Sequence, residues 1–264
     1  MRHFPHQYTQ IGEAVTFGSI PMERFQSSLL AVSLIVPLSR ETVTENALVS
    51  LMLGKSTRDY PTYRLFSRKL GLLYGAVAGT SIQKLGDEES ITFAASVIDN
   101  SLALGGENLL EESAKLLLSM IFHPLIENGA FAPETFAIQK KYLADSIRAE
   151  INEKRRYAIN QTLRLMLGDE PAGLPMYGFL EELEKMTPQT AAAAYERILK
   201  TCRVEIIHVG TGDANSVRPL FEEAFGEQFA AGRTPCTRPA PRKISAADTV
   251  KTAQDDFEVI QSKL

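Results

Sequence analysis

Residues 41–84, ETVTENALVSLMLGKSTRDYPTYRLFSRKLGLLYGAVAGTSIQK, predict three consecutive elements on which the rest of the fold is built. The first is an apolar helix that ends near Gly54, since glycine commonly terminates a helix. The second is a helix over residues 61–73, with a proline in its first turn and a turn at Gly75 after it. The third is a β-like run over residues 76–84.

The first helix has both a start signal and a helical spacing of apolar residues. Thr42, followed three residues later by Glu45, fits a capping box, in which each residue satisfies a free backbone N–H group at the helix start. The apolar side chains recur three or four residues apart, as a helix with a buried face requires. They are Val43, Ala47, Leu48, Leu51 and Met52.

Two hairpins are expected, one before this stretch and one at its end. Residues 12–20 and 27–37 read as strands, and the proline-containing turn between them predicts that they pair. Residues 76–85 and 89–99 form the second pair, because the turn at Gly86 separates two runs rich in β-forming residues.

The rest of the chain reads as helices with one strand among them. Proline, glycine and the apolar spacing set the expected boundaries. The expected elements are helices over residues 109–122 and 133–167, a short helix near Leu180, a helix over 189–200, a strand over 203–210 and a helix over 214–225. This order predicts an α+β fold, with one mixed or antiparallel sheet and helices packed mainly on one face.

Composition and charge favour a globular protein and argue against several other classes. Of the 264 residues, 44% are hydrophobic and 23% are charged, which is close to average globular usage. The net charge of −4 argues against a nucleic-acid partner, which would need a basic face. No stretch is long and apolar enough to span a membrane, and we expect no secretory signal. Cys202 and Cys236 form no disulfide framework, so we expect a cytoplasmic location.

The helix within residues 46–57 is similar in outline to the zinc helix of the pitrilysin/insulinase-type (M16) metallopeptidases. That family carries a His-x-x-Glu-His motif just before a Met-Leu-Phe-x-Gly-Thr-like end, and here the register reads NALVS followed by LMLGKST. Similar short strings follow in the family's order over about residues 10–225. They are Tyr60-Pro61-Thr62, Leu70-Gly71, Tyr74-Gly75-Ala76, residues 136–147, residues 175–178, Thr187-Pro188 and residues 204–210. Inactive bacterial members named for elongation factor P modification show a similar pattern.

The resemblance implies a zinc site, but the residues at its positions do not supply one. Two ligand histidines four residues apart would share a helix face, and those positions hold Asn46 and Ser50. The general base falls at Val49 and the third ligand at Ser146. None of these side chains is a usual zinc ligand or proton acceptor. We therefore expect no metal, no zinc cofactor and no catalytic residue, and we do not expect an active peptidase.

Three further positions bear on the missing site. Gln139 stands where the family has a supporting Glu, and Gly79 stands near the position of a polar residue beside the scissile carbonyl. Glu150, one turn after Ser146, would restore one ligand if the register were shifted. One carboxylate alone cannot hold a zinc ion.

The alternative is an active metallopeptidase or another hydrolase with an unconventional centre. Nucleophile and base residue types are present at Ser50, Ser146, His123 and His208. No spacing among them supports a catalytic triad. His123 suits a helix C-terminus, and His208 suits a half-buried strand. His3 and His6 have no nearby Glu or Cys, so a terminal pair is favoured over a metal site.

The resemblance also implies a partner, because family members work as paired half-domains or as an active and an inactive subunit. The expected partner is an active M16 homologue or a second copy of this chain. A sheet edge also offers unpaired N–H and C=O groups to which an extended peptide can add as a strand. The strand over residues 76–85 is the candidate edge, with a position inside the sheet as the alternative. Its central residues are Ala78, Gly79, Thr80, Ser81 and Ile82.

Two regions are expected along the chain. Residues 1–226 correspond to one half-domain of the family. Residues 227–264 are expected to begin as a proline-rich, extended linker. Their last part, residues 256–264, resembles the start of a second half-domain.

Overall fold

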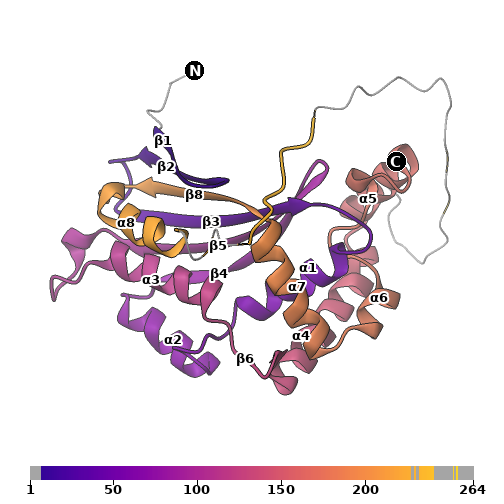
Figure 1. The fold of residues 1–264 in the computed structure, drawn as a ribbon, viewed down its shortest axis with the longest axis horizontal. Helices are drawn as coiled ribbons and strands as arrows, with labels where there is room; N and C mark the ends of the chain where they lie inside the picture. Colours follow the sequence, from indigo (N-terminus) through magenta and orange to yellow (C-terminus); the bar gives the residue numbers. More distant parts are fainter. Residues whose placement is uncertain (1–6, 227–228, 230–231, 241–251, 253, 255–264) are drawn as a thin grey trace.

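Six strands form one mixed sheet in the order β1-β2-β8-β3-β5-β4 (Figure 1). The computed structural model describes residues 7–226, 229, 232–240, 252 and 254. The strands of the sheet are β1 (Gln7–Gly12), β2 (Val15–Pro21), β3 (Ser27–Pro37), β4 (Val77–Leu85), β5 (Glu88–Ile98) and β8 (Arg203–Gly210). Neighbouring strands are antiparallel, except that β2 and β8 run parallel.

Helices lie mainly against one face of this sheet (Figure 1). That face carries the core, because alternate residues of the central strands, such as Leu30, Val32 and Ile206, are almost completely buried there. The α-helices are α1 (Val43–Leu53), α2 (Tyr63–Leu72), α3 (Leu109–Phe122), α4 (Pro133–Ala149), α5 (Lys154–Leu167), α6 (Leu180–Lys185), α7 (Pro188–Thr201) and α8 (Ala214–Ala224). The predicted α+β class, with one mixed sheet and helices mainly on one face, is confirmed.

The predicted β4–β5 hairpin is confirmed, and it lies at one side of the sheet. Nine residue pairs run from Val77 opposite Ser96 to Leu85 opposite Glu88. Gly86 takes a φ of +67°, a conformation that glycine adopts without strain in a two-residue turn. Because β4 pairs only with β5 among the described residues, it is an edge strand rather than an interior one.

The predicted hairpin between residues 12–20 and 27–37 is wrong. Strand β8 lies between β2 and β3 and pairs with both of them. The connection after β2 passes the end of β8, where the Met22 N–H donates to the carbonyl of Gly210 at 2.9 Å. A distant strand of alternating apolar residues therefore displaces the local pairing, which local turn signals cannot reveal.

Two further boundaries differ from the prediction. The chain turns sharply after β1, with Ala14 at a φ of +54°, so the strand expected over residues 12–20 starts at Val15 and β1 precedes it. The single helix expected over 133–167 is divided into α4 and α5 by a 3-10 turn, Glu150–Asn152. The Glu150 carboxylate accepts a hydrogen bond from Asn160 of α5, which holds the 3-10 turn against that helix. Neither glycine nor proline marks this break in the sequence.

The predicted capping box at the start of α1 does not form. Thr42 is the N-cap residue, but its side chain makes no capping hydrogen bond and lies 3.0 Å from the Ser39 hydroxyl. A complete capping box is found instead at α7, where Thr187 and Thr190 satisfy each other's backbone N–H groups. Helix α2 begins at Tyr63, with Thr62 as its cap.

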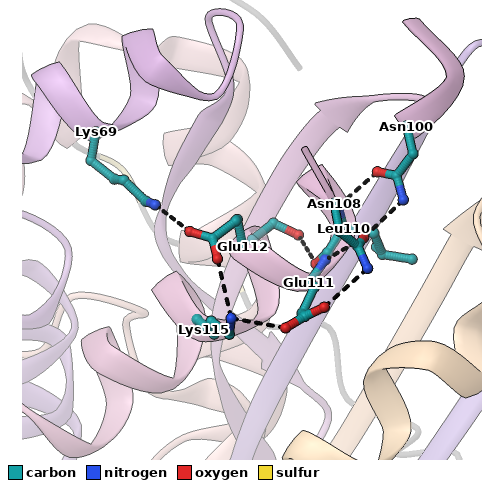
Figure 2. A network of polar contacts seen from close by, with 8 residues as sticks. Lys69, Asn100, Asn108, Leu110, Glu111, Glu112 and Lys115 are labelled. Carbon is teal, nitrogen blue, oxygen red and sulfur yellow. Dashed lines mark hydrogen bonds and ion pairs between the residues drawn. The ribbon is translucent and has the colours of Figure 1, made fainter. Parts of the chain in front are cut away.

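A polar network joins α3 to α2 and to the end of β5 (Figure 2). Asn108 caps α3 by accepting the N–H of Glu111 at 3.2 Å, and it also accepts a 2.8 Å bond from Asn100. Lys69 of α2 donates to Glu112 at 2.5 Å. These contacts hold the start of α3 against α2 and against the 3-10 turn Asn100–Leu102 that follows β5. None of the described helices has the length and apolar composition that crossing a lipid bilayer requires.

Candidate functional site

Helix α1 carries three of the four positions that the resemblance assigns to zinc chemistry. It is buried on nearly every side, because it packs between β4 and β5 on one side and α4 and α7 on the other. Asn46, Val49 and Ser50 are each at most 2% exposed. A helix enclosed in this way holds its side chains in fixed positions.

Asn46 connects three elements by hydrogen bonds. Its side-chain N–H group donates to Glu89 of β5 at 2.9 Å. Its amide oxygen accepts a 3.0 Å bond from the guanidinium of Arg197 on α7. The same guanidinium forms a 2.5 Å ion pair with Glu45. The residue at the first zinc-ligand position therefore holds α1 to a strand and to another helix.

Glu89 is the buried carboxyl group of this network. Its side chain is completely buried, and burial raises its pKa to about 8, although the hydrogen bond from Asn46 acts in the opposite direction. The second carboxyl oxygen has no hydrogen-bond partner among the described residues. Glu89 is therefore mostly protonated and uncharged at neutral pH.

The other positions of the expected motif are occupied by residues that pack in the core or form hydrogen bonds within the fold. Val49 is fully enclosed in the hydrophobic core. The carbonyl of Ser50 accepts a 2.7 Å bond from the Thr80 hydroxyl, and the hydroxyl of Ser146 donates to Tyr142 within α4 at 2.9 Å. Gln139 is buried in the same helix.

These residues do not fit a zinc ion. Zinc sites in proteins use imidazole, thiolate or carboxylate ligands, and the motif positions supply an amide, an isopropyl group and two hydroxyls. The Arg197 guanidinium, 3.0 Å from the Asn46 oxygen, also places a positive charge where a cation would have to bind. Within the described part of the chain, no group of three or more His, Cys, Asp or Glu side chains could hold a metal. No metal-assisted step can be derived from this set.

The free side of β4 is the second feature of the region. Since the turn has two residues, Leu85 and Glu88 exchange both backbone hydrogen bonds, and antiparallel pairs alternate from there. The residues whose N–H and C=O groups point away from β5 are Ala78, Thr80, Ile82 and Lys84. No strand of the described residues pairs with that side.

The edge strand is fixed to the helix that carries the motif positions. Besides the Thr80–Ser50 hydrogen bond, α1 approaches so closely that a Cβ atom at Gly54 would lie 2.4 Å from the Thr80 hydroxyl. A Cβ atom added at Gly79 would have no neighbouring atom within 4 Å, so this position faces open space. The five candidate positions 78–82 thus lie together on the edge strand, where the side chain of Ile82 is buried in the core and the other four positions are half-buried or exposed.

The serines and histidines considered for an unconventional hydrolase do not form a common site in the structure. His123 lies 3.1 Å from the Asp59 carboxylate and His208 lies 3.4 Å from the Ser19 hydroxyl, so neither is paired with Ser50 or Ser146. His3 and His6 lie outside the described residues. Sequence reasoning missed Glu89 and Arg197. Glu89 is the second residue of β5, beside the turn and next to Glu88, a place where a charged residue gives no signal of burial.

Comparisons with known proteins agree with this geometry. No protein-family model matches the chain. It is 25% identical over 250 residues to the probable inactive metalloprotease YmfF of Bacillus subtilis, covering 95% of this chain and 58% of that protein. A conserved protein from Enterococcus faecalis matches with a TM-score of 0.78 at 26% identity, over 83% of this chain and 52% of that one. The peptidase M16 inactive domain from Pseudomonas fluorescens matches with a TM-score of 0.62 at 14% identity, over 90% of this chain and 53% of that one.

The fold is thus that of a half-domain of the kind found in M16 peptidases. In sequence the chain is similar to a probable inactive metalloprotease, in line with the resemblance described above. It spans about half the length of the relative and of the solved structures described above.

Proposed function

We propose that this chain is a non-catalytic M16-like module that binds an extended peptide along β4. The observation that carries the proposal is the free edge of that strand, with the backbone groups of Ala78, Thr80 and Ile82 directed outward. An extended peptide can pair with such groups without any metal ion. The neighbouring motif positions, Asn46 and Ser50, are engaged in packing and hydrogen bonds instead of catalysis.

The inactivity of the module is supported by two independent observations. The motif positions hold no zinc ligand, and the relative in Bacillus subtilis is itself named as a probable inactive metalloprotease. We propose that the module acts beside an active zinc peptidase of the same fold, in the cytoplasm. Residues 227–264, most of which lie outside the described residues, would link it to a second half-domain.

Metal content separates this proposal from the alternative of an active metallopeptidase. The purified, untagged protein is incubated with zinc, desalted and analysed for bound metal. We expect well below one zinc ion per chain and no hydrolysis of peptides. About one zinc per chain, lost on Glu150→Gln, would revive the enzyme hypothesis.

Strand addition is tested by proline substitutions in β4, using a ten-residue peptide selected for binding from a synthetic library. Ala78→Pro removes an outward N–H group and leaves Thr80 and the buried side chain of Ile82 unchanged. Proline at such an edge position leaves the β4–β5 hydrogen bonds intact. We expect Ala78→Pro to weaken binding at least several-fold while the fold is retained.

Ser81→Pro is the matched control, because its N–H group points toward β5 and its loss disturbs the hairpin itself. We expect this variant to lose thermal stability, whereas Ala78→Pro loses mainly peptide affinity. Equal peptide affinity in the parent protein and a folded Ala78→Pro variant would show that the edge does not bind the peptide.

A further inference from the structure

A cavity of about 710 Å³ lies away from α1 and β4, between α3, α7 and the end of α8. Helix α3 contributes Lys115, Leu118, Ser119 and Phe122, which share one face because they are three or four residues apart. This volume is within the usual range for sites that bind small molecules.

The walls of the cavity are largely apolar. Leu118 and Phe122 of α3 face Leu199 of α7, and Ala224 and Phe229 also line the cavity. The rings of Phe122 and Phe229 meet edge to face, with centroids 5.5 Å apart. Beside it, the Tyr195 hydroxyl of α7 donates to the carbonyl of Ile121 at 2.7 Å, which joins the two helices. This hydrogen bond ties together the two helices that form most of the cavity wall.

The polar residues of the cavity carry an excess of positive charge. Arg233 donates its N–H groups to backbone carbonyls of Leu199, Glu13 and Cys202, and its guanidinium lies 4.0 Å from the centre of the Phe229 ring. Neither Arg233 nor Lys200 forms an ion pair within the described part of the chain. One acidic residue of the lining, Glu196, also forms no ion pair within the described residues.

The remaining charged groups of the lining are paired with each other or with neighbours. Lys115 forms ion pairs with Glu111 at 2.8 Å and with Glu112 at 3.2 Å (Figure 2). The Asp59 carboxylate accepts a 2.6 Å bond from Ser119 and lies 3.1 Å from His123. The charges left for a ligand are consequently those of Lys200 and Arg233, opposed by the single charge of Glu196.

We propose that this cavity binds an amphipathic small molecule, an acyl or aryl carboxylate of medium length. Its apolar body lies between Phe122 and Leu199, and its carboxylate lies near Lys200 and Arg233. Burial of the apolar body supplies most of the affinity, and the two cations select an anionic head group. The proposal is independent of peptide binding, since no residue of β4 or α1 lines the cavity.

The test is calorimetric titration of the protein with decanoate, kept below its micelle concentration. We expect saturable binding of one molecule per chain. Ala224→Phe should abolish it by filling the cavity, and Lys200→Glu should weaken it several-fold. Ala193→Phe, on the exposed side of α7, is the matched control and should leave binding unchanged.

Three results would overturn the proposal. One is the absence of saturable binding. Another is unchanged binding to Ala224→Phe, confirmed as folded by its thermal unfolding, because an unspecific surface site would then be responsible. The third is equal affinity for decyltrimethylammonium, which has a similar chain and the opposite charge. Lys200→Glu is a surface change that keeps the head-group test valid even if Ala224→Phe fails to fold.

Discussion

At the scale of single residues, a carboxyl group without a charged partner keeps its proton when the fold encloses it. Glu89 is such a group, with a pKa of about 8 against an ordinary value of 4.5. Between these values the native state holds a proton that the unfolded chain has lost. The contribution of Glu89 to stability is therefore fully present below pH 4.5 and falls as the pH rises towards 8, by up to about 1.4 kcal/mol per pH unit.

Glu89→Gln should remove this dependence, because the amide has the shape of the protonated acid and does not titrate. We expect the free energy of unfolding to fall less steeply between pH 5 and 8 than in the parent protein. Urea denaturation at pH 5.5, 7 and 8.5 measures the slope. Glu23→Gln, at an exposed turn, is the control, and equal slopes in all three proteins would contradict the argument.

Asn46 is expected to act as a structural residue. Asn46→Ala leaves the Glu89 carboxyl and the Arg197 guanidinium each without one hydrogen-bond partner. The loss should cost about 1–3 kcal/mol of unfolding free energy, because a buried polar group is left unsatisfied. Chemical denaturation at pH 7 measures it, with exposed Asn215→Ala as control. A cost equal to that of the control would show that the network contributes nothing to stability.

At the scale of elements, we expect the N-cap residues of α1 and α7 to contribute differently to stability. Thr187→Ala removes a cap that forms, and should cost about 1 kcal/mol of unfolding free energy. Thr42→Ala removes a side chain that makes no capping bond, and should cost less than half as much unfolding free energy as Thr187→Ala. Thermal and urea unfolding of both variants provide the comparison. The reverse order of stabilities would mean that Thr42 is the working cap.

Elements with strong local signals could be predicted from the sequence, and those set by distant contacts could not. The β4–β5 hairpin follows from Gly86 and its flanking β-formers, and α3 has the predicted bounds because Pro124 prevents its continuation. The insertion of β8 between β2 and β3 depends on residues about 180 positions apart, so no local pattern contains it. The same limit applies to the site. The residues at the positions of the expected zinc motif, Asn46, Val49 and Ser50, could be read from the sequence, whereas the contact of Asn46 with Arg197 joins helices that are distant in sequence.

At the scale of the whole molecule, the sheet is completed by a strand from late in the chain. Strand β8 lies at its centre, and Val204 and Ile206 are buried in the core beneath it. Without β8, the facing sides of β2 and β3 would lose their backbone hydrogen bonds, and α8 would lose its place against the core. Buried backbone groups without partners are costly, so the preceding 200 residues should not form a stable sheet alone.

This argument predicts that a chain ending at Thr201 does not fold, although it contains five of the sheet's six strands and seven of its eight α-helices among the described residues. A chain ending at Gly226, which adds β8 and α8, should unfold cooperatively on heating. Circular dichroism and the dispersion of amide proton signals distinguish the two. Cooperative unfolding of the shorter chain at the same temperature would mean that β1 to β5 form a self-sufficient sheet, and that β8 only extends it. Loss of cooperativity in the shorter chain alone would show that the half-domain folds as one unit that its late strand completes.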